Sequence, residues 1–273
     1  MGAPHLRVVR RCGSFLDVGL FLMNRDITTL PPVPASERIR YGKDSSQFFD
    51  LFRPYGPSRG SAMMIHGGFW RARYDLQHAS HLCAALAHQG ITVASLEYRR
   101  VGEPGGGWPG TYEDMLAGFD SVLNLLGEPL AVLGHSAGGH LALRLSADRK
   151  PAGIIALAPV ADLIQAYELN LSDGAVVEFL GDTPENAPDR YRDADAKAHA
   201  SSVRRFLIHG EKDDVVPISL SFSYLEARSA DRPDVVLAKL SLADHFDLID
   251  PETTSGAWET VRLTVRACLG KPA

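Results

Sequence analysis

The residues best suited to chemistry lie in the pentapeptide Gly134-His135-Ser136-Ala137-Gly138, a G-x-S-x-G pattern. A short apolar run precedes it, and a stretch with helical spacing follows it. Its glycines permit a tight turn in which the serine backbone is strained and its hydroxyl projects from the edge of a sheet. We therefore predict that Ser136 is a nucleophile. The alternative interpretation is a glycine-rich turn with a structural role only.

A serine hydroxyl needs a base to take its proton at neutral pH, and that base needs a group to orient it. Where a nucleophilic serine lies between a strand and a helix, the chain order is serine, acid, histidine. The apolar segment 206–208 leads into a turn that carries two carboxylates, Asp213 and Asp214. His245 is the only histidine after them, so it is the predicted base. Either carboxylate could orient it on spacing alone.

The segment His66-Gly67-Gly68-Phe69-Trp70 follows another apolar run. Two glycines let the backbone approach a reacting carbonyl group closely. The N–H groups of Gly68 and Phe69 can then join that of Ala137 in an oxyanion hole, aided by the positive end of the helix that begins there. The alternative is a simple turn between a strand and a loop.

Two tryptophans are candidates for the wall of a substrate pocket. Trp70 lies beside the predicted oxyanion hole, and Trp108 lies in the glycine-rich loop 102–110. Pockets for small molecules are lined mainly by apolar and aromatic side chains. Three successive glycines in this loop do not indicate a nucleotide site, because no Gly-Lys-Ser/Thr follows them.

Strand and helix patterns alternate along the chain. Predicted strands cover residues 46–53, 62–65, 91–96, 130–133, 154–157, 205–208 and 235–240. Predicted helices cover residues 76–88, 111–126, 137–147 and 257–269, and Thr111 with Asp114 forms a capping pattern. Strands separated by helices of this length imply crossover connections. We therefore predict a single α/β domain with a mostly parallel central sheet flanked by helices.

Two regions fall outside this alternation. Residues 1–35 form a predicted N-terminal extension that ends in a proline-rich stretch, and residues 36–273 form the predicted domain. Residues 160–202 are longer than an ordinary crossover, which is typical either of a lid over a site or of a solvated surface excursion.

Composition restricts the classes of partner. With 28 basic and 33 acidic residues, the formal net charge is −5, and the basic residues are scattered rather than clustered. Nucleic-acid binding requires a basic surface, so we expect no nucleic-acid partner. The expected partner is a small-molecule ester or amide substrate; nothing in the sequence indicates an oligomeric state.

The three cysteines, Cys12, Cys83 and Cys268, are far apart and show no paired spacing. This argues against a disulfide framework and against a zinc site. We expect neither a metal ion nor another cofactor. Asp17 interrupts the apolar stretch 15–23, so we expect no secretory signal, no membrane span and a cytoplasmic location.

The combined motifs resemble the α/β-hydrolase superfamily. They are residues 66–70, residues 134–141, Asp213 and His245, and the similarity extends from about Phe48 to Leu269. Phe69 stands where many esterases have a third glycine, which is similar to the kynurenine-formamidase-like branch. The resemblance favours Asp213 over Asp214, because it matches the acid of a G-x-x-D-x-x-V-P turn.

The resemblance implies a serine hydrolase that cleaves small carboxylic esters through an acyl-enzyme. An arylformamidase acting on an N-formylkynurenine-type amide is the first alternative, because both reactions pass through a tetrahedral oxyanion. A peptidase and a non-catalytic binding protein on the same fold are further alternatives. Fold resemblance cannot choose among substrates.

Overall fold

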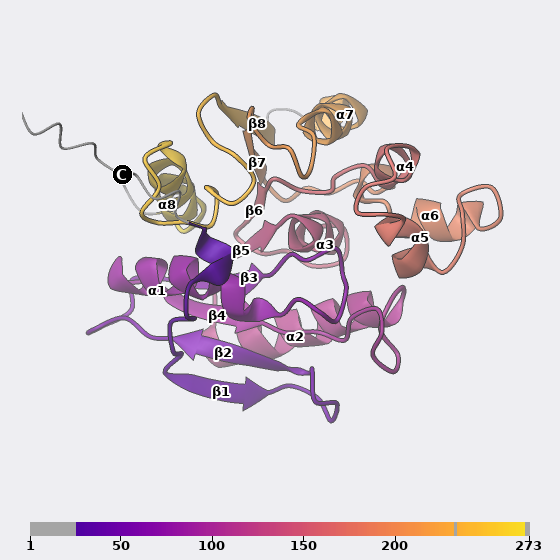
Figure 1. Ribbon diagram of the computed structural model, residues 1–273. Coiled ribbons are helices and arrows are strands. Elements are labelled where there is room, and N and C mark those ends of the chain that lie inside the picture. Colours follow the sequence, from indigo (N-terminus) through magenta and orange to yellow (C-terminus); the bar gives the residue numbers. More distant parts are fainter. Residues whose placement is uncertain (1–25, 232–233, 271–273) are drawn as a thin grey trace, which may run out of the picture.

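The computed structural model describes residues 26–231 and 234–270. Its centre is an eight-stranded sheet with the order β1-β2-β4-β3-β5-β6-β7-β8 (Figure 1). The strands are β1 (Glu37–Arg40), β2 (Phe48–Phe52), β3 (Ser61–Ile65), β4 (Thr92–Leu96), β5 (Leu130–His135), β6 (Gly153–Leu157), β7 (Arg205–Gly210) and β8 (Val235–Leu240). β1, β2 and β4 pair antiparallel, whereas β4, β3, β5, β6, β7 and β8 pair parallel. The predicted α/β class with a mostly parallel sheet is confirmed.

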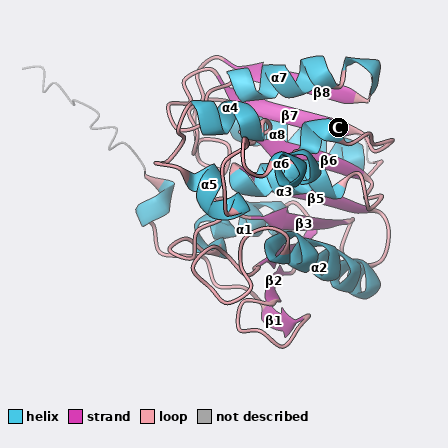
Figure 2. Cartoon of the chain, turned by 90° about the vertical axis from the view of Figure 1, so that its right-hand side faces the viewer, coloured by secondary structure: helices cyan, strands magenta, loops and turns pink. Residues whose placement is uncertain are grey.

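Helices cover both faces of the sheet (Figures 1 and 2). One face carries α1 (Ser80–His88) and α8 (Ala257–Cys268). The other carries α2 (Gly110–Leu126), α3 (Ala137–Leu145) and α7 (Ser219–Ala227), together with the short helices α4 (Leu163–Glu168), α5 (Ala175–Leu180) and α6 (Pro188–Ala194). These three short helices occupy the region predicted as an insertion.

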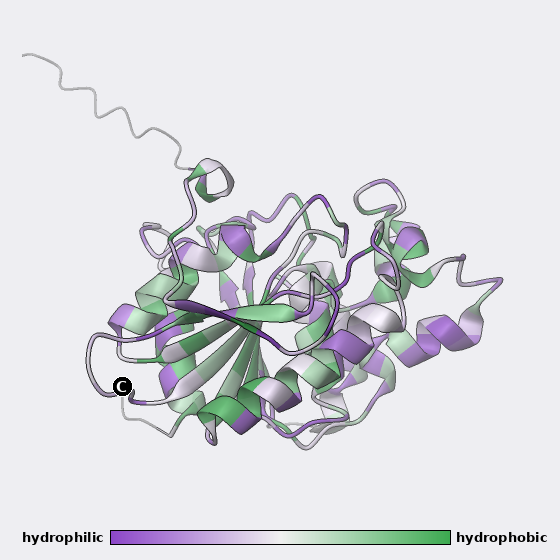
Figure 3. Cartoon of the chain, turned by 90° about the horizontal axis from the view of Figure 1, so that it is seen from below, coloured by the Kyte–Doolittle hydropathy of each residue, from purple (hydrophilic) through white to green (hydrophobic). Residues whose placement is uncertain are grey.

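Side-chain alternation along the strands builds two separate cores. In β5, Val132 points into the core shared with α2 and α3, whereas Ala131 and Leu133 point into the core shared with α1 and α8. Every residue of β5 is buried, as expected for a central parallel strand with helices on both faces. The central strands are accordingly the most hydrophobic part of the fold, and the helices carry polar residues on their outer sides (Figure 3).

The order of the strands creates the place where a site can form. β3 lies between β4 and β5, so the crossovers from β3 to β4 and from β4 to β5 lead in opposite directions across the sheet. In open parallel sheets, ligands bind beyond the carboxyl ends of the strands at such a reversal. The loop after β3 and the turn after β5 are the two segments predicted to do chemistry, and this topology makes them neighbours.

Each predicted strand and helix is present, with ends shifted by a few residues, but the capping pattern at Thr111 is wrong. α2 begins at Gly110, and no side chain caps it. The Thr111 hydroxyl instead donates to the carbonyl oxygen of Arg99 at 2.5 Å, and Asp114 pairs with the Arg99 guanidinium. Both Thr111 and Asp114, which the local pattern assigned to a helix cap, therefore bind Arg99 in the loop after β4 instead.

The short strand β1 and the helix α7 are absent from the predicted elements. Within the predicted N-terminal extension, Ile27 is buried against the α1–α8 core, and the N–H of Val33 donates to the Ser80 hydroxyl at 3.0 Å.

The sequence arguments about the stretch 15–23 and Cys12 concern residues outside the described part of the chain. In that described part, no helix is long and apolar enough to cross a membrane.

We predict that Leu133→Ala lowers the free energy of unfolding by about 2–5 kcal/mol, because it leaves a cavity in a fully buried strand. The matched control is Leu242→Ala, at a position that is 61% exposed, which should change stability by less than about 0.5 kcal/mol. Urea unfolding followed by circular dichroism measures both. Equal losses in the two variants would contradict the burial described for β5.

Candidate active site

Ser136 lies at the sharp turn between β5 and α3. Its backbone has φ +56° and ψ −119°, a region that costs energy for any residue with a side chain. This turn requires glycine at both flanking positions: a Cβ on Gly134 would lie 2.1 Å from the Gly138 carbonyl oxygen, and one on Gly138 would lie 2.2 Å from that of Ile65. The predicted turn is therefore present, with its serine strained.

Asp213 and His245 are brought together from the ends of two neighbouring strands, β7 and β8. The His245 Nδ1–H donates to Asp213 Oδ2 at 2.7 Å, and both side chains are almost completely buried. A carboxylate on Nδ1 fixes the tautomer of the ring and leaves the lone pair on Nε2. His245 is thereby prepared to accept a proton at Nε2.

The Asp213 carboxylate is itself held by a set of donors. Its Oδ1 accepts the backbone N–H groups of Val215 at 2.9 Å and Val216 at 2.8 Å. His209 Nε2 lies 3.3 Å from Oδ2. Burial alone would raise the pKa of Asp213, but the contacts with His209, His245 and Val216 outweigh it and hold this pKa well below its usual value. Asp213 is therefore an anion at any pH at which the protein would be assayed.

The neighbouring Asp214 has a different environment. It is exposed to solvent, and of these two carboxylates it is Asp213 that accepts the His245 Nδ1–H. His209 is a supporting residue that sequence reasoning missed. The sequence could have indicated it, because His209 is a histidine inside an apolar strand that ends just before the predicted acid, Asp213.

The predicted oxyanion loop packs directly on Ser136. A Cβ on Gly67 would lie 3.0 Å from the Ser136 Cβ, so this glycine permits the close approach. Gly68 has φ +102° and Phe69 has φ +51°, and both line the same cavity as Ser136. Ala137 is the first residue of α3, where backbone N–H groups have no partner within the helix. The structure thus brings all three predicted donors to one place.

The expectation that Trp70 and Trp108 line the pocket is corrected by the structure. Trp70 follows Phe69 in a second left-handed conformation, which turns its ring into the core, fully buried and stacked on Phe179 at 4.4 Å. Trp108 stacks on Tyr112 at 4.9 Å, and its Nε1–H donates to Asp193 of α6. Neither ring lines the cavity at Ser136, and both fix the insertion helices to the domain.

A cavity of about 620 Å³ opens in front of Ser136. His245, Phe246 and Val215 form one side of it, and residues 73–75 with Gln77 and His78 form another. Thr28, Leu30 and Pro32 also line it, so the N-terminal segment supplies a wall that the sequence did not reveal. The insertion 160–202 also contributes to the lining of this cavity, through Ser172. The volume suits a small molecule.

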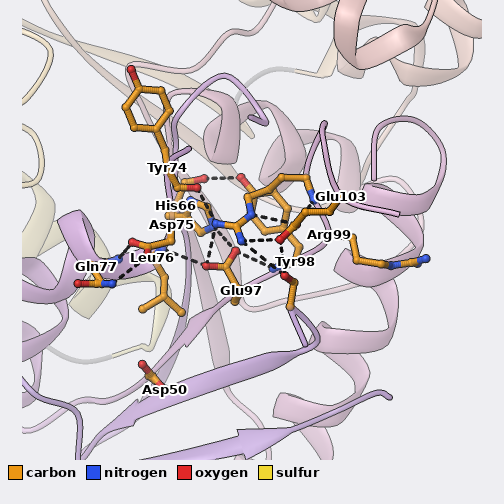
Figure 4. Close-up of polar contacts among 12 residues, drawn as sticks. Asp50, His66, Tyr74, Asp75, Leu76, Gln77, Glu97, Tyr98, Arg99 and Glu103 are labelled. Carbon is orange, nitrogen blue, oxygen red and sulfur yellow. Dashed lines mark hydrogen bonds and ion pairs between the residues drawn. The ribbon is translucent and has the colours of Figure 1, made fainter. Parts of the chain in front are cut away.

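A buried ionic network supports the two loops on the β3–β4 side of this cavity (Figure 4). Its centre is Glu97, just after β4, whose carboxylate accepts from His66 Nε2 at 2.8 Å and from the backbone N–H of Leu76 at 3.2 Å. Arg100 Nη1 lies 3.3 Å from the same carboxylate and donates to the carbonyl oxygen of Tyr74 at 2.7 Å. One carboxylate therefore ties the oxyanion loop to the cavity wall.

His135 connects the serine turn to the base. It is fully buried, burial lowers its pKa well below the usual value, and its Nε2–H donates to the backbone carbonyl oxygen of His245 at 3.0 Å. The two imidazole rings lie 4.6 Å apart. His135, the first variable position of the G-x-S-x-G pattern, thus holds the backbone of the predicted base His245 in place.

Within residues 26–231 and 234–270, no group of three or more histidine, cysteine, aspartate or glutamate side chains is arranged to hold a metal ion. Cys83 is buried in α1, where burial raises the pKa of its thiol to about 12, as expected for a small core residue.

The family model described as BD-FAE matches residues 50–227 of the chain. No curated protein matches it. Solved structures with the same fold include a truncated carbohydrate esterase from gut microbiota, which is 16% identical with a TM-score of 0.75 over 89% of this chain and 100% of the other.

Two further neighbours are hydrolases. A structure of Esterase B from Lactobacillus rhamnosis with a tributyrin phosphonate is 20% identical, with a TM-score of 0.69 over 87% of each chain. An acetyl ester-xyloside bifunctional hydrolase from Caldicellulosiruptor lactoaceticus is 19% identical, with a TM-score of 0.72 over 88% of this chain and 99% of the other. The α/β-hydrolase fold is confirmed, whereas the kynurenine-formamidase branch is not.

We predict that Asp213→Asn lowers kcat by about 10⁴-fold, because an amide cannot hold the required tautomer of His245. Asp214→Asn is the matched control on the adjacent, exposed residue and should retain nearly full activity. Steady-state kinetics with an activated ester measures both variants. A dead Asp214 variant beside an active Asp213 variant would mean that the acid is misassigned by one residue.

Proposed function

The chain belongs to the BD-FAE family, and from this premise we propose that it is a serine esterase that cleaves small carboxylic esters through an acyl-enzyme. The observation that carries the proposal is the His245–Asp213 hydrogen bond of 2.7 Å beside a cavity that also contains the strained Ser136. The esterase and hydrolase neighbours support the same class of reaction.

In the proposed acylation step, Nε2 of His245 takes the proton of the Ser136 hydroxyl as Oγ attacks the ester carbonyl carbon. The carbonyl π electrons move to oxygen, and the N–H groups of Gly68, Phe69 and Ala137 stabilise this oxyanion. The ionised Asp213 stabilises the imidazolium. When the tetrahedral species collapses, the C–O bond to the alcohol breaks, and His245 gives its proton to the departing alkoxide.

Deacylation repeats these movements with water. His245 takes a proton from water, the hydroxide adds to the acyl carbon, and the bond to Oγ breaks as the proton returns to Ser136. No residue beyond the three proposed catalytic side chains and the backbone donors is required. The buried Glu97 network and His135 supply rigidity, because misplacing the reacting groups by about 1 Å can cost about 10²-fold in rate.

The arylformamide alternative loses the support of Trp70, which is buried, but Phe69, Tyr74 and Phe246 still offer aromatic rings in the cavity that contains Ser136. A substrate screen with Ser136→Ala as the reference distinguishes an esterase from an arylformamidase, a peptidase and a non-catalytic binding protein. A formamide rate above that of p-nitrophenyl acetate would restore the formamidase reading. The expected cytoplasmic location also remains a prediction.

We predict that a fluorophosphonate probe labels the protein covalently and that Ser136→Ala abolishes the label while lowering kcat by about 10⁴-fold or more. Ser172→Ala is the matched control at a second serine of the same cavity, and it should keep the label. Mass spectrometry of the labelled peptide identifies the modified serine. Labelling that survives in Ser136→Ala would refute the assignment.

We predict that kcat/KM rises with pH through one ionisation and then levels off, because His245 must be neutral to accept the serine proton. The Asp213 pKa lies well below its usual value, so this carboxylate stays charged and adds no second acidic step. Burial lowers the pKa of His78 to about 4 and holds the pKa of His135 well below its usual value, so both are neutral through the assay range.

The measurement is a pH–rate profile between about pH 5 and 9, repeated with EDTA. The same curve is expected under both conditions. A profile that falls as the pH rises from the acidic end, or activity that EDTA removes and zinc restores, would contradict the mechanism.

A further inference from the structure

Arg73 is a charged residue that the proposed chemistry does not use. It lies in the loop that joins the oxyanion loop to the 3₁₀ turn Leu76–Ala79, and it lines the cavity that contains Ser136 and His245. Among the residues that line this cavity, Arg73 is the one with a permanent positive charge.

The neighbouring arginines are all neutralised by carboxylates. Arg71 pairs with Glu178 at 2.6 Å, Arg99 pairs with Asp114 at 2.7 Å, and Arg100 pairs with Glu97 and Glu103. In the described chain, no carboxylate lies within ion-pair distance of Arg73. Arg71 is therefore paired with a carboxylate, whereas Arg73, two positions later, is not. The Arg73 guanidinium is available to a ligand.

The exposed Arg73 side chain contacts the ring of its neighbour Tyr74. Its guanidinium carbon lies 5.0 Å from the centre of the Tyr74 ring, a cation–π arrangement. Tyr74 packs on the oxyanion loop, since a Cβ on Gly68 would lie 2.4 Å from the Tyr74 Cβ. The Tyr74 ring stands away from the buried network, while its carbonyl oxygen is held by Arg100 (Figure 4).

None of the other titratable groups that line the cavity is paired with this guanidinium. Asp75 is the lining carboxylate, but it forms a turn with both oxygens engaged: Oδ1 accepts the Gln77 N–H at 2.9 Å and Oδ2 accepts the Gln77 side-chain amide at 2.8 Å. His78 and His135 are neutral at physiological pH, because burial lowers the pKa of each.

We propose that Arg73 is a specificity-determining residue and that the preferred substrates are esters bearing a carboxylate group away from the scissile bond. The inference rests on the serine-esterase function proposed above. A guanidinium presents a planar fork of donors that matches a carboxylate in two parallel hydrogen bonds. Bound in this way, the carboxylate anchors the substrate across the Tyr74 ring from the oxyanion hole.

The test compares two pairs of esters that differ only in charge. In the first pair the charge is on the alcohol side, 4-acetoxybenzoate against 4-acetoxybenzamide. In the second it is on the acyl side, p-nitrophenyl adipate against p-nitrophenyl adipamate. The measured quantity is the ratio of kcat/KM for the anionic ester to that for its neutral partner, corrected for their rates of alkaline hydrolysis.

We expect this ratio to fall by about tenfold in Arg73→Gln for at least one pair, since a hydrogen bond to a charged group contributes about that factor. Arg73→Lys should recover part of the ratio, and Arg73→Glu should lower it further. The matched control is Arg204→Gln, an exposed arginine just before the amino end of β7, at the end of the sheet opposite the cavity, which should leave the ratio unchanged. The effect should weaken as salt is added.

A ratio that Arg73→Gln changes in neither pair would overturn the proposal, whatever the absolute rates. Hydrolysis of the neutral esters by the parent protein but not by Ser136→Ala would then leave the serine-esterase function standing. If no ester were hydrolysed in a Ser136-dependent way, the function would fail, and the specificity built on it would fail as well.

Discussion

At Gly138, the first turn of α3 lies against the carbonyl oxygens of Ile65 and His66 at the end of β3, with no space for a side chain between them. This backbone-to-backbone contact determines the rest of the site. It places the loop with Gly68 and Phe69 beside Ser136, and it requires glycine at position 138. Once β3 and β5 are paired in this register, Ser136 and the loop with Gly68 and Phe69 cannot lie far apart.

Around that contact, two kinds of support hold the loops. On the β7–β8 side, Asp213 collects donors from His209, His245 and the backbone of its own turn. On the β4 side, Glu97 collects donors from His66, Leu76 and Arg100. Both carboxylates follow the carboxyl ends of strands, where several loops converge. A buried anion with several donors is costly to move, which makes each loop rigid without a disulfide.

The sequence was sufficient for those features that depend on local pattern. Strand runs, the G-x-S-x-G turn and the order of acid and base follow from residues that are adjacent or ordered along the chain. Features that depend on tertiary contact were not predictable. Trp70 turns inward because two successive residues adopt φ above zero, and Thr111 bonds to Arg99 rather than capping its helix. Likewise, no pattern near Thr28 or Leu30 indicates that they reach a cavity formed by residues far along the chain.

The left-handed conformation of Ser136 carries a consequence for how such a protein evolves. For a residue with a side chain, this region costs about 1–2 kcal/mol, and glycine would occupy it almost freely. Selection for stability alone would therefore favour glycine here, and keeping serine exchanges some stability for the hydroxyl that we propose as the nucleophile. Domains of this size have only about 5–15 kcal/mol of stability in total. The packing of the strands on both sides of the turn must therefore offset the strain at Ser136.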